Sequence, residues 1–198
     1  MVRVYSAADV HAALPWAALA QALREAFIQG AEVPVRHAHA LAEGQSLLLM
    51  PAWDEQLIVT KLVTVIPGAP QTVQASVVAL DRATGAPRAI LDGEAITLRR
   101  TAATSALAAQ ALARPDAQTL LVVGAGHLAP WMVRAHVALR PTLRRVQVWA
   151  RRAEAAQGLA RGLIAEGIPC EPVAVDDLPK AVAGAHIVCA ATTSSEPI

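Results

Sequence analysis

The stretch QTLLVVGAGHLA, residues 118–129, constrains the fold more than any other part of the sequence. A continuous apolar run, typical of a buried strand, leads into Gly124, Gly126 and Ala129 in the spacing G-x-G-x-x-A. Gly124 would permit a tight turn, and Gly126 would let a pyrophosphate approach the backbone at the start of a helix. The alternative is a turn with a purely structural role. The pattern favours a dinucleotide site.

Strands and helices alternate strictly after these glycines. The predicted helices cover 127–139, 153–166 and 177–183, and the predicted strands cover 145–150, 170–175 and 185–192. Because these strands are apolar on both faces, they indicate a parallel sheet with helices on both faces. We therefore expect an α/β, Rossmann-type dinucleotide-binding domain over 117–198.

Residues 1–116 have a different pattern. Two helices are expected before Gly30 and a long alanine-rich helix over 97–113. Strands separated by Gly, Pro and Asp are expected over 33–41, 45–53, 57–66, 72–81 and 86–94, with a hairpin turn at 81–87. This part is expected to be an α+β domain with an antiparallel sheet.

Composition excludes several classes of function. The net charge is +1 and only six residues are aromatic, so neither a nucleic-acid partner nor an anionic membrane surface is expected. No apolar run reaches the roughly 18–20 residues of a membrane-spanning helix. Cys170 and Cys189 lack metal-site spacing, and His37 with His39 offers only two ligands, so no metal is expected. With no signal-peptide pattern at the start, we expect a cytoplasmic protein.

The end of the second strand of the predicted Rossmann domain bears on the choice of dinucleotide. NAD sites usually carry an acid there for the ribose hydroxyl, whereas this chain has Ala150, Arg151 and Arg152, with no acid before Glu154. Guanidinium groups can bind a 2′-phosphate in a bidentate manner. NADP(H) is therefore favoured, with NAD(H) as the alternative. The two arginines could also simply begin a solvated helix.

Lys61 interrupts an apolar strand pattern in LIVTKLVTVI, residues 57–66. In a strand it would share a face with Val59, Val63 and Val65. An ammonium group among valines is costly unless an anion pairs with it, which makes a substrate carboxylate a candidate partner. Such a lysine could also donate a proton to a C=N bond. The alternative is an edge strand whose lysine reaches water.

The segment LDGEAITLRRTAATSALAA, residues 91–109, joined to the glycine loop, resembles the ornithine cyclodeaminase/mu-crystallin family. The resemblance extends from about residue 5 to the end of the chain. It implies a substrate-binding and dimerisation domain over 1–116, a nicotinamide dinucleotide domain over 117–198, and a homodimer. Family members include reductases of cyclic imino acids, amino-acid cyclodeaminases, some alanine dehydrogenases and NADPH-binding mu-crystallins.

The resemblance also assigns roles on the substrate side. Arg36 in VPVRH matches an arginine that holds the substrate carboxylate, and Lys61 matches a lysine beside the reacting group. Thr72 in PQTV and Arg100 in LRRTAA match residues that bridge substrate and cofactor. Lys61 and Arg100 are therefore the expected catalytic residues. Arg99, the neighbour of Arg100, is a candidate solvated residue.

On the cofactor side, His127 and Leu128 match two helix-start positions that face the pyrophosphate, and Thr192 matches a loop contact. Members often have Ala-Gln or Val-Gln at the first two positions, so a side-chain contact to the phosphates is expected to be absent here. The family pattern continues beyond the position of Ile198, and its catalytic aspartate matches no residue of this chain. The dinucleotide domain is thus expected to be incomplete at residue 198.

The leading hypothesis is an NAD(P)H-dependent reductase of a small cyclic imino acid such as pyrroline-2-carboxylate. An NAD-dependent ornithine cyclodeaminase, which forms proline and ammonia, is the enzyme alternative; the missing acid at Ala150 counts against it. A non-catalytic NADP(H)-dependent small-molecule binder of the mu-crystallin type is the alternative from another class.

Overall fold

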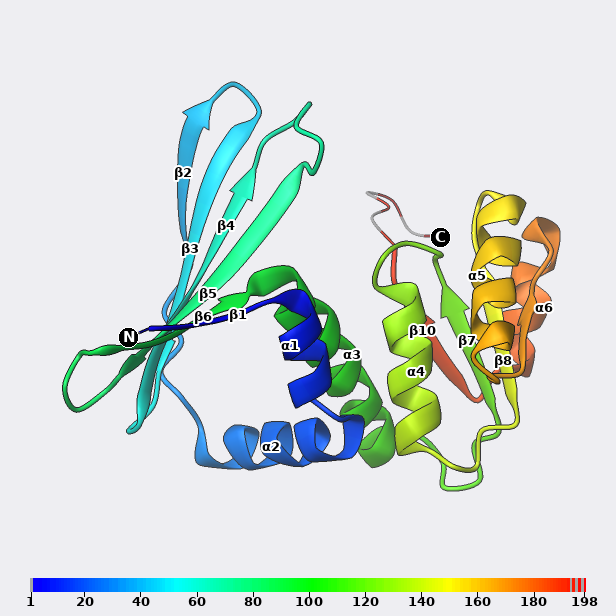
Figure 1. Ribbon diagram of the computed structural model, residues 1–198. Coiled ribbons are helices and arrows are strands. Elements are labelled where there is room, and N and C mark those ends of the chain that lie inside the picture. Colours follow the sequence, from blue (N-terminus) through cyan, green and yellow to red (C-terminus); the bar gives the residue numbers. More distant parts are fainter. Residues whose placement is uncertain (1, 193, 195, 197) are drawn as a thin grey trace. The chain divides into compact units, whose positions relative to one another are not determined.

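The computed structural model describes the whole chain except residues 1, 193, 195 and 197. The chain forms two compact units, Met1–Arg99 and Arg100–Ile198. The helix α3 (Gly93–Leu112) crosses from one to the other (Figure 1). The division predicted between residues 116 and 117 instead assigns all of α3 to the first domain, and it stays a prediction.

The first unit contains two helices and a six-stranded sheet. Its elements are β1 (Arg3–Tyr5), α1 (Ala7–Ala13), α2 (Trp16–Gln29), β2 (His37–Ala42), β3 (Gln45–Trp53), β4 (Leu57–Val65), β5 (Val73–Asp81), β6 (Pro87–Asp92) and the first residues of α3. The helix α1 begins in a capping box, in which the Ser6 hydroxyl accepts from the Asp9 amide and the Asp9 carboxylate accepts from Ser6. The helix α2 ends at Gly30, whose φ of 79° favours glycine.

The strand order is β1-β6-β5-β4-β3-β2. Strands β2 to β6 are antiparallel neighbours, as the sequence predicts. The three-residue strand β1 pairs in parallel with β6, so the sheet is mixed rather than wholly antiparallel. Such a short segment carries too little alternation for its sequence to predict a strand.

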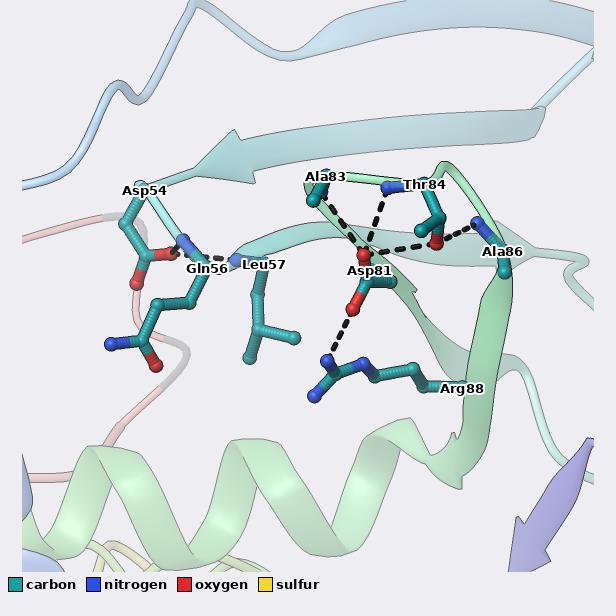
Figure 2. Close-up of polar contacts among 8 residues, drawn as sticks. All are labelled: Asp54, Gln56, Leu57, Asp81, Ala83, Thr84, Ala86 and Arg88. Carbon is teal, nitrogen blue, oxygen red and sulfur yellow. Dashed lines mark hydrogen bonds and ion pairs between the residues drawn. The ribbon is translucent and has the colours of Figure 1, made fainter.

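One aspartate holds the turn before β4 and another holds the turn after β5 (Figure 2). The Asp54 carboxylate accepts from the amides of Gln56 and Leu57, both at 2.7 Å. The Asp81 carboxylate accepts from the amide and hydroxyl of Thr84 and from the Arg88 guanidinium, and these interactions lower the pKa of Asp81 to about 2. The predicted hairpin turn at 81–87 is thus held by a local hydrogen-bond network.

The second unit is a parallel sheet in the order β10-β7-β8-β9. Its elements after α3 are β7 (Thr119–Val123), α4 (Ala129–Leu139), β8 (Arg145–Trp149), α5 (Ala153–Ala165), β9 (Cys170–Pro172), the 3-10 turn Val175–Asp177, α6 (Leu178–Gly184) and β10 (Ile187–Ala190). Successive residues of β7 point to opposite faces and are all buried, so both faces of the sheet are covered. This arrangement confirms the predicted Rossmann-type fold.

The order of the strands decides which face each helix covers. The chain steps outward from β7 to β8 and β9, then returns across β7 to β10. Right-handed crossovers therefore place α4 and α5 on one face and α6 on the other. Consistent with this, Ala181 of α6 packs in one cluster with Leu121, Val123 and Trp149.

Candidate functional site

Gly124 sits at the sharp turn that follows β7, with a φ of 118°. A Cβ atom at this position would lie 2.3 Å from the carbonyl oxygen of Ala191. The turn is held on both sides, because the Gly124 amide donates to the Trp149 carbonyl and the Ala191 amide donates to the Val123 carbonyl, each at 2.7 Å. Only glycine satisfies both the backbone angle and the close approach.

Gly126 has a different environment, because a Cβ atom there would meet nothing within 4 Å. It leads into α4, whose N-cap residue, Leu128, provides no side-chain hydrogen bond. Pro130 lies in the first turn, where its missing N–H is not needed. The helix start therefore presents a positive dipole end beside open space, which is the environment that an anionic phosphate requires.

A hollow of about 370 Å³ lies over this turn. It brings together Gly124, Gly126, Arg151, Arg152 and Thr192, all of which the sequence predicts as cofactor contacts. It is also lined by Ala125, Trp149, Ala150, Ala155, Ala191 and Ile198. Its size is within the usual range of small-molecule sites.

Four predicted cofactor residues are not among those that line this hollow: Thr72, Arg100, His127 and Leu128. The side chain of His127 is exposed and that of Leu128 is half-buried.

The sequence did not predict Ala155 of α5 as a lining residue, because nothing in an alanine's local sequence shows that it faces a ligand. Trp149 is held by a hydrogen bond from its indole N–H to the Val175 carbonyl at 3.0 Å.

The charge of the hollow suits an anion. Arg151 and Arg152 are both exposed where they line it, and none of the described residues that line it is acidic. The small side chain of Ala150 stands where NAD sites usually have an acid, and it is buried. These residues fit a dinucleotide, with the glycine turn for its pyrophosphate and the arginines for a phosphate on its ribose.

Lys61 lies in the middle of β4, opposite Met50 on one side and Val77 on the other. Directly paired residues of an antiparallel sheet project to the same face, so the lysine stem runs between apolar side chains. The stem is half-buried, and the ammonium donates a hydrogen bond of 3.3 Å to the hydroxyl of Thr97 on α3. Lys61 therefore projects toward the first turns of α3 and not from an edge strand into water.

Arg36 immediately precedes β2 and is exposed. The β2–β3 register pairs His37 with Leu49, so its continuation by one residue places Arg36 opposite Met50. Met50 in turn pairs with Lys61. Extended by one residue beyond its last pair, this register would put Arg36 and Lys61 in one row and on one face, two strands or about 10 Å apart at the backbone. This separation suits two long side chains that converge on a small anion.

Thr72 lies on the loop between β4 and β5 and is exposed. Its carbonyl accepts from the Ile66 amide at 2.8 Å, which closes the loop. The neighbouring Gln71 donates to the Glu94 carboxylate at 2.7 Å and thereby fastens the loop to the start of α3. The loop that carries Thr72 is therefore anchored rather than loose.

The two adjacent arginines of α3 are in opposite environments. Arg99 is 7% exposed, and its guanidinium lies 3.8 Å above the centre of the Trp16 ring. It is therefore a buried packing residue and not the solvated one considered from the sequence. Arg100 is exposed and follows Thr97 by three residues, so both project from one side of α3.

Within the described part of the chain, no cluster of three or more His, Cys, Asp or Glu residues could hold a metal ion. In the same part, no helix combines the length and apolarity that a bilayer span requires.

The family model of the ornithine cyclodeaminase/mu-crystallin family matches residues 2–198. A Delta(1)-pyrroline-2-carboxylate reductase of Paracoccus denitrificans is 39% identical over 198 residues, which cover 96% of this chain and 61% of that protein. The ketimine reductase mu-crystallin of mouse is 33% identical over 85% of this chain and 54% of its own length. The chain thus spans less than two thirds of these relatives.

Among solved structures, the chain is similar to a Delta(1)-pyrroline-2-carboxylate reductase of Thermococcus litoralis in complex with NADH and L-proline. The TM-score is 0.89 at 26% identity, and the match covers 100% of this chain and 64% of that one. A lysine cyclodeaminase structure matches with a TM-score of 0.80 at 27% identity, over 98% of this chain and 61% of that one. The described residues therefore have the backbone arrangement of nicotinamide-dependent enzymes.

Proposed function

Because the chain belongs to the ornithine cyclodeaminase/mu-crystallin family, we propose that the protein is an NADPH-dependent reductase of a small cyclic imino acid. The observation that carries the proposal is the hollow in which Gly124, Gly126, Arg151 and Arg152 meet, because it combines a phosphate-binding turn with a cationic wall. Relatives 39% and 32% identical to the chain bear the name Delta(1)-pyrroline-2-carboxylate reductase, which supports a five-membered cyclic imine as substrate.

The substrate carboxylate is bound by Arg36, Lys61 and Arg100. Arg36 and Lys61 share a face of the sheet, and α3 carries Arg100 on the side of Thr97. A guanidinium binds a carboxylate in a planar, bidentate manner, which fixes the orientation of the imine ring. Lys61 Nζ carries the proton that balances the charge of the substrate and that can pass to the imine nitrogen.

The cofactor is held by the glycine turn and the arginine wall. When bound, NADPH supplies a hydride to the imine carbon. The glycine turn and the positive end of α4 bind the pyrophosphate, Thr192 contacts the cofactor from the loop after β10, and Arg151 with Arg152 binds the 2′-phosphate. Thr72 bridges substrate and cofactor from its anchored loop, and His127 and Leu128 contribute through their backbone.

The protein acts as a homodimer. The sheet face opposite Lys61 carries half-buried or exposed apolar side chains, among them Leu49, Leu62, Val78 and Ile90. Burying such a face requires a partner, and a second copy offers the same surface. Sedimentation of the full-length protein at micromolar concentration tests this: a monomer at all concentrations contradicts it.

Incubation of full-length protein with NADPH and pyrroline-2-carboxylate, followed by nicotinamide absorbance, tests the activity. We expect oxidation of NADPH and formation of proline, and loss of turnover in Lys61→Met. Tight NADPH binding without turnover of any cyclic imine would instead identify a small-molecule binder. Ammonia release from ornithine, with NAD retained on the purified protein, would identify a cyclodeaminase.

The preference for NADP(H) has its own test. Arg151→Asp places a carboxylate where the 2′-phosphate is proposed to bind, so the ratio of NADPH to NADH affinity should fall by at least about tenfold. Arg161→Asp, on the same unit but outside the hollow, controls for the change in net charge. An unchanged ratio in Arg151→Asp would show that the 2′-phosphate lies elsewhere.

A further inference from the structure

The hydroxyl of Thr97 connects the proposed catalytic lysine to the backbone of α3. It donates to the Gly93 carbonyl at 2.7 Å and accepts from Lys61 Nζ at 3.3 Å. A hydroxyl has one proton, and here the shorter bond to Gly93 takes it. The oxygen lone pairs are therefore directed at the lysine, so Thr97 can act toward Lys61 only as an acceptor.

The start of α3 is fixed to the sheet at several points, which makes Thr97 a stationary acceptor. The Asp92 carboxylate accepts from the Ala95 amide at 2.7 Å. Gly93 packs so tightly on β5 that a Cβ atom there would lie 2.6 Å from the Ala75 carbonyl carbon. The Gln71–Glu94 hydrogen bond ties the adjacent loop to the same turn.

The bond to Thr97 gives the Lys61 ammonium a fixed acceptor, which its cross-strand neighbours do not provide. Its cross-strand partners are Met50 and Val77, which pack on the stem but do not select a direction for the ammonium. A long lysine side chain loses rotamer entropy when substrate binding fixes it, and this loss opposes binding. A hydrogen bond to a fixed hydroxyl removes part of that freedom in advance.

We propose that Thr97 is a positioning residue that holds the Lys61 ammonium toward the substrate carboxylate. This inference rests on the proposed reductase function and extends it to a residue that does not itself touch the substrate. Thr97 acts through Lys61, so its removal should weaken binding of the imino acid and leave binding of the dinucleotide unchanged.

The chain offers a matched control on the same helix. The Thr104 hydroxyl donates to the Arg100 carbonyl at 2.7 Å, with the same spacing of four residues as Thr97 and Gly93. Thr97→Val and Thr104→Val therefore remove the same kind of helix bond with the same change in shape, but only the first removes an acceptor from a lysine. Thr97→Ser keeps the hydroxyl.

In full-length protein, we expect Thr97→Val to raise KM for pyrroline-2-carboxylate by about tenfold, which corresponds to about 1.4 kcal/mol. The Kd for NADPH should change by less than about twofold, and Thr97→Ser and Thr104→Val should both stay near wild type. The proposal is overturned if Thr97→Val leaves KM unchanged, if Thr104→Val raises it equally, or if Thr97→Ser does not restore it.

A second measurement is independent of turnover. Trace acylation followed by peptide mass spectrometry compares Lys61 with Lys180, which is exposed and serves as the internal reference. Only the neutral amine reacts, and the acceptor stabilises the ammonium, so relative labelling of Lys61 should rise several-fold in Thr97→Val but not in Thr104→Val. If the wild type lacks turnover, the reductase proposal fails, but the labelling rates still decide whether Thr97 positions Lys61. Equal labelling of Lys61 in all variants would refute that role of Thr97.

Discussion

The same added methyl group should have different effects at the two glycines of the loop after β7: it should lower stability at Gly124 and NADPH affinity at Gly126. In Gly124→Ala the new Cβ atom would lie 2.3 Å from the Ala191 oxygen, far inside contact distance. A φ of 118° adds backbone strain of about 1–3 kcal/mol for an L-residue. Ala191 can move aside only by breaking its bond to the Val123 carbonyl, at a further cost of about 0.5–1.5 kcal/mol. Gly124→Ala should therefore destabilise the protein by about 2–4 kcal/mol.

In Gly126→Ala the methyl group meets nothing within 4 Å, and the backbone angle is not in the left-handed region. Stability should change by less than about 1 kcal/mol. The same methyl group enters the space through which a pyrophosphate approaches the helix start, so NADPH affinity should fall by about tenfold or more.

Urea unfolding followed by circular dichroism measures stability, and a fluorescence titration with NADPH measures affinity. The expected result is a lower urea midpoint for Gly124→Ala alone, and weaker binding at unchanged midpoint for Gly126→Ala. If Gly126→Ala binds NADPH as wild type does, the pyrophosphate does not approach this turn. If Gly124→Ala unfolds at the wild-type midpoint, the tight approach of Ala191 does not constrain the fold.

Two further predictions concern pH and one concerns packing. The pKa of Asp81 in the folded state is about 2, below its ordinary value of 3.8. The Asp81 carboxylate therefore stabilises the fold above about pH 4, and this stabilisation is lost as the pH falls toward 2. Asp81→Asn should make the acid-unfolding curve less steep between these pH values. Burial lowers the pKa of His136 from 6.5, so wild type should lose stability as pH falls below 6.5, and His136→Gln should reduce that slope in thermal melts. Trp16→Leu removes the ring beneath Arg99 and should lower the free energy of unfolding by about 1–3 kcal/mol, whereas an unchanged urea midpoint would show that the stacking contributes nothing.

Some residues of the candidate site could be predicted from the sequence, and others could not. The glycine turn and the arginine pair were predictable because their chemistry depends on local sequence: a strand, a spacing of glycines, and the next strand's end. Ala155 was not, because its part in the hollow depends on how α5 packs. The partner of Lys61 was also beyond sequence reasoning, since Thr97 lies 36 residues away and its role depends on where α3 crosses the sheet.

Sequence alone determined the class of fold and most of the elements, though not β1, because alternation, apolar runs and Gly or Pro punctuation act over a few residues. It also predicted the glycine turn that follows β7. Only the tertiary structure decided that Arg99 is buried against Trp16 while Arg100 is exposed, although the two are adjacent and chemically identical. It also paired His37 with Leu49 and Met50 with Lys61, because register and burial are set by contacts between segments that are distant in the chain.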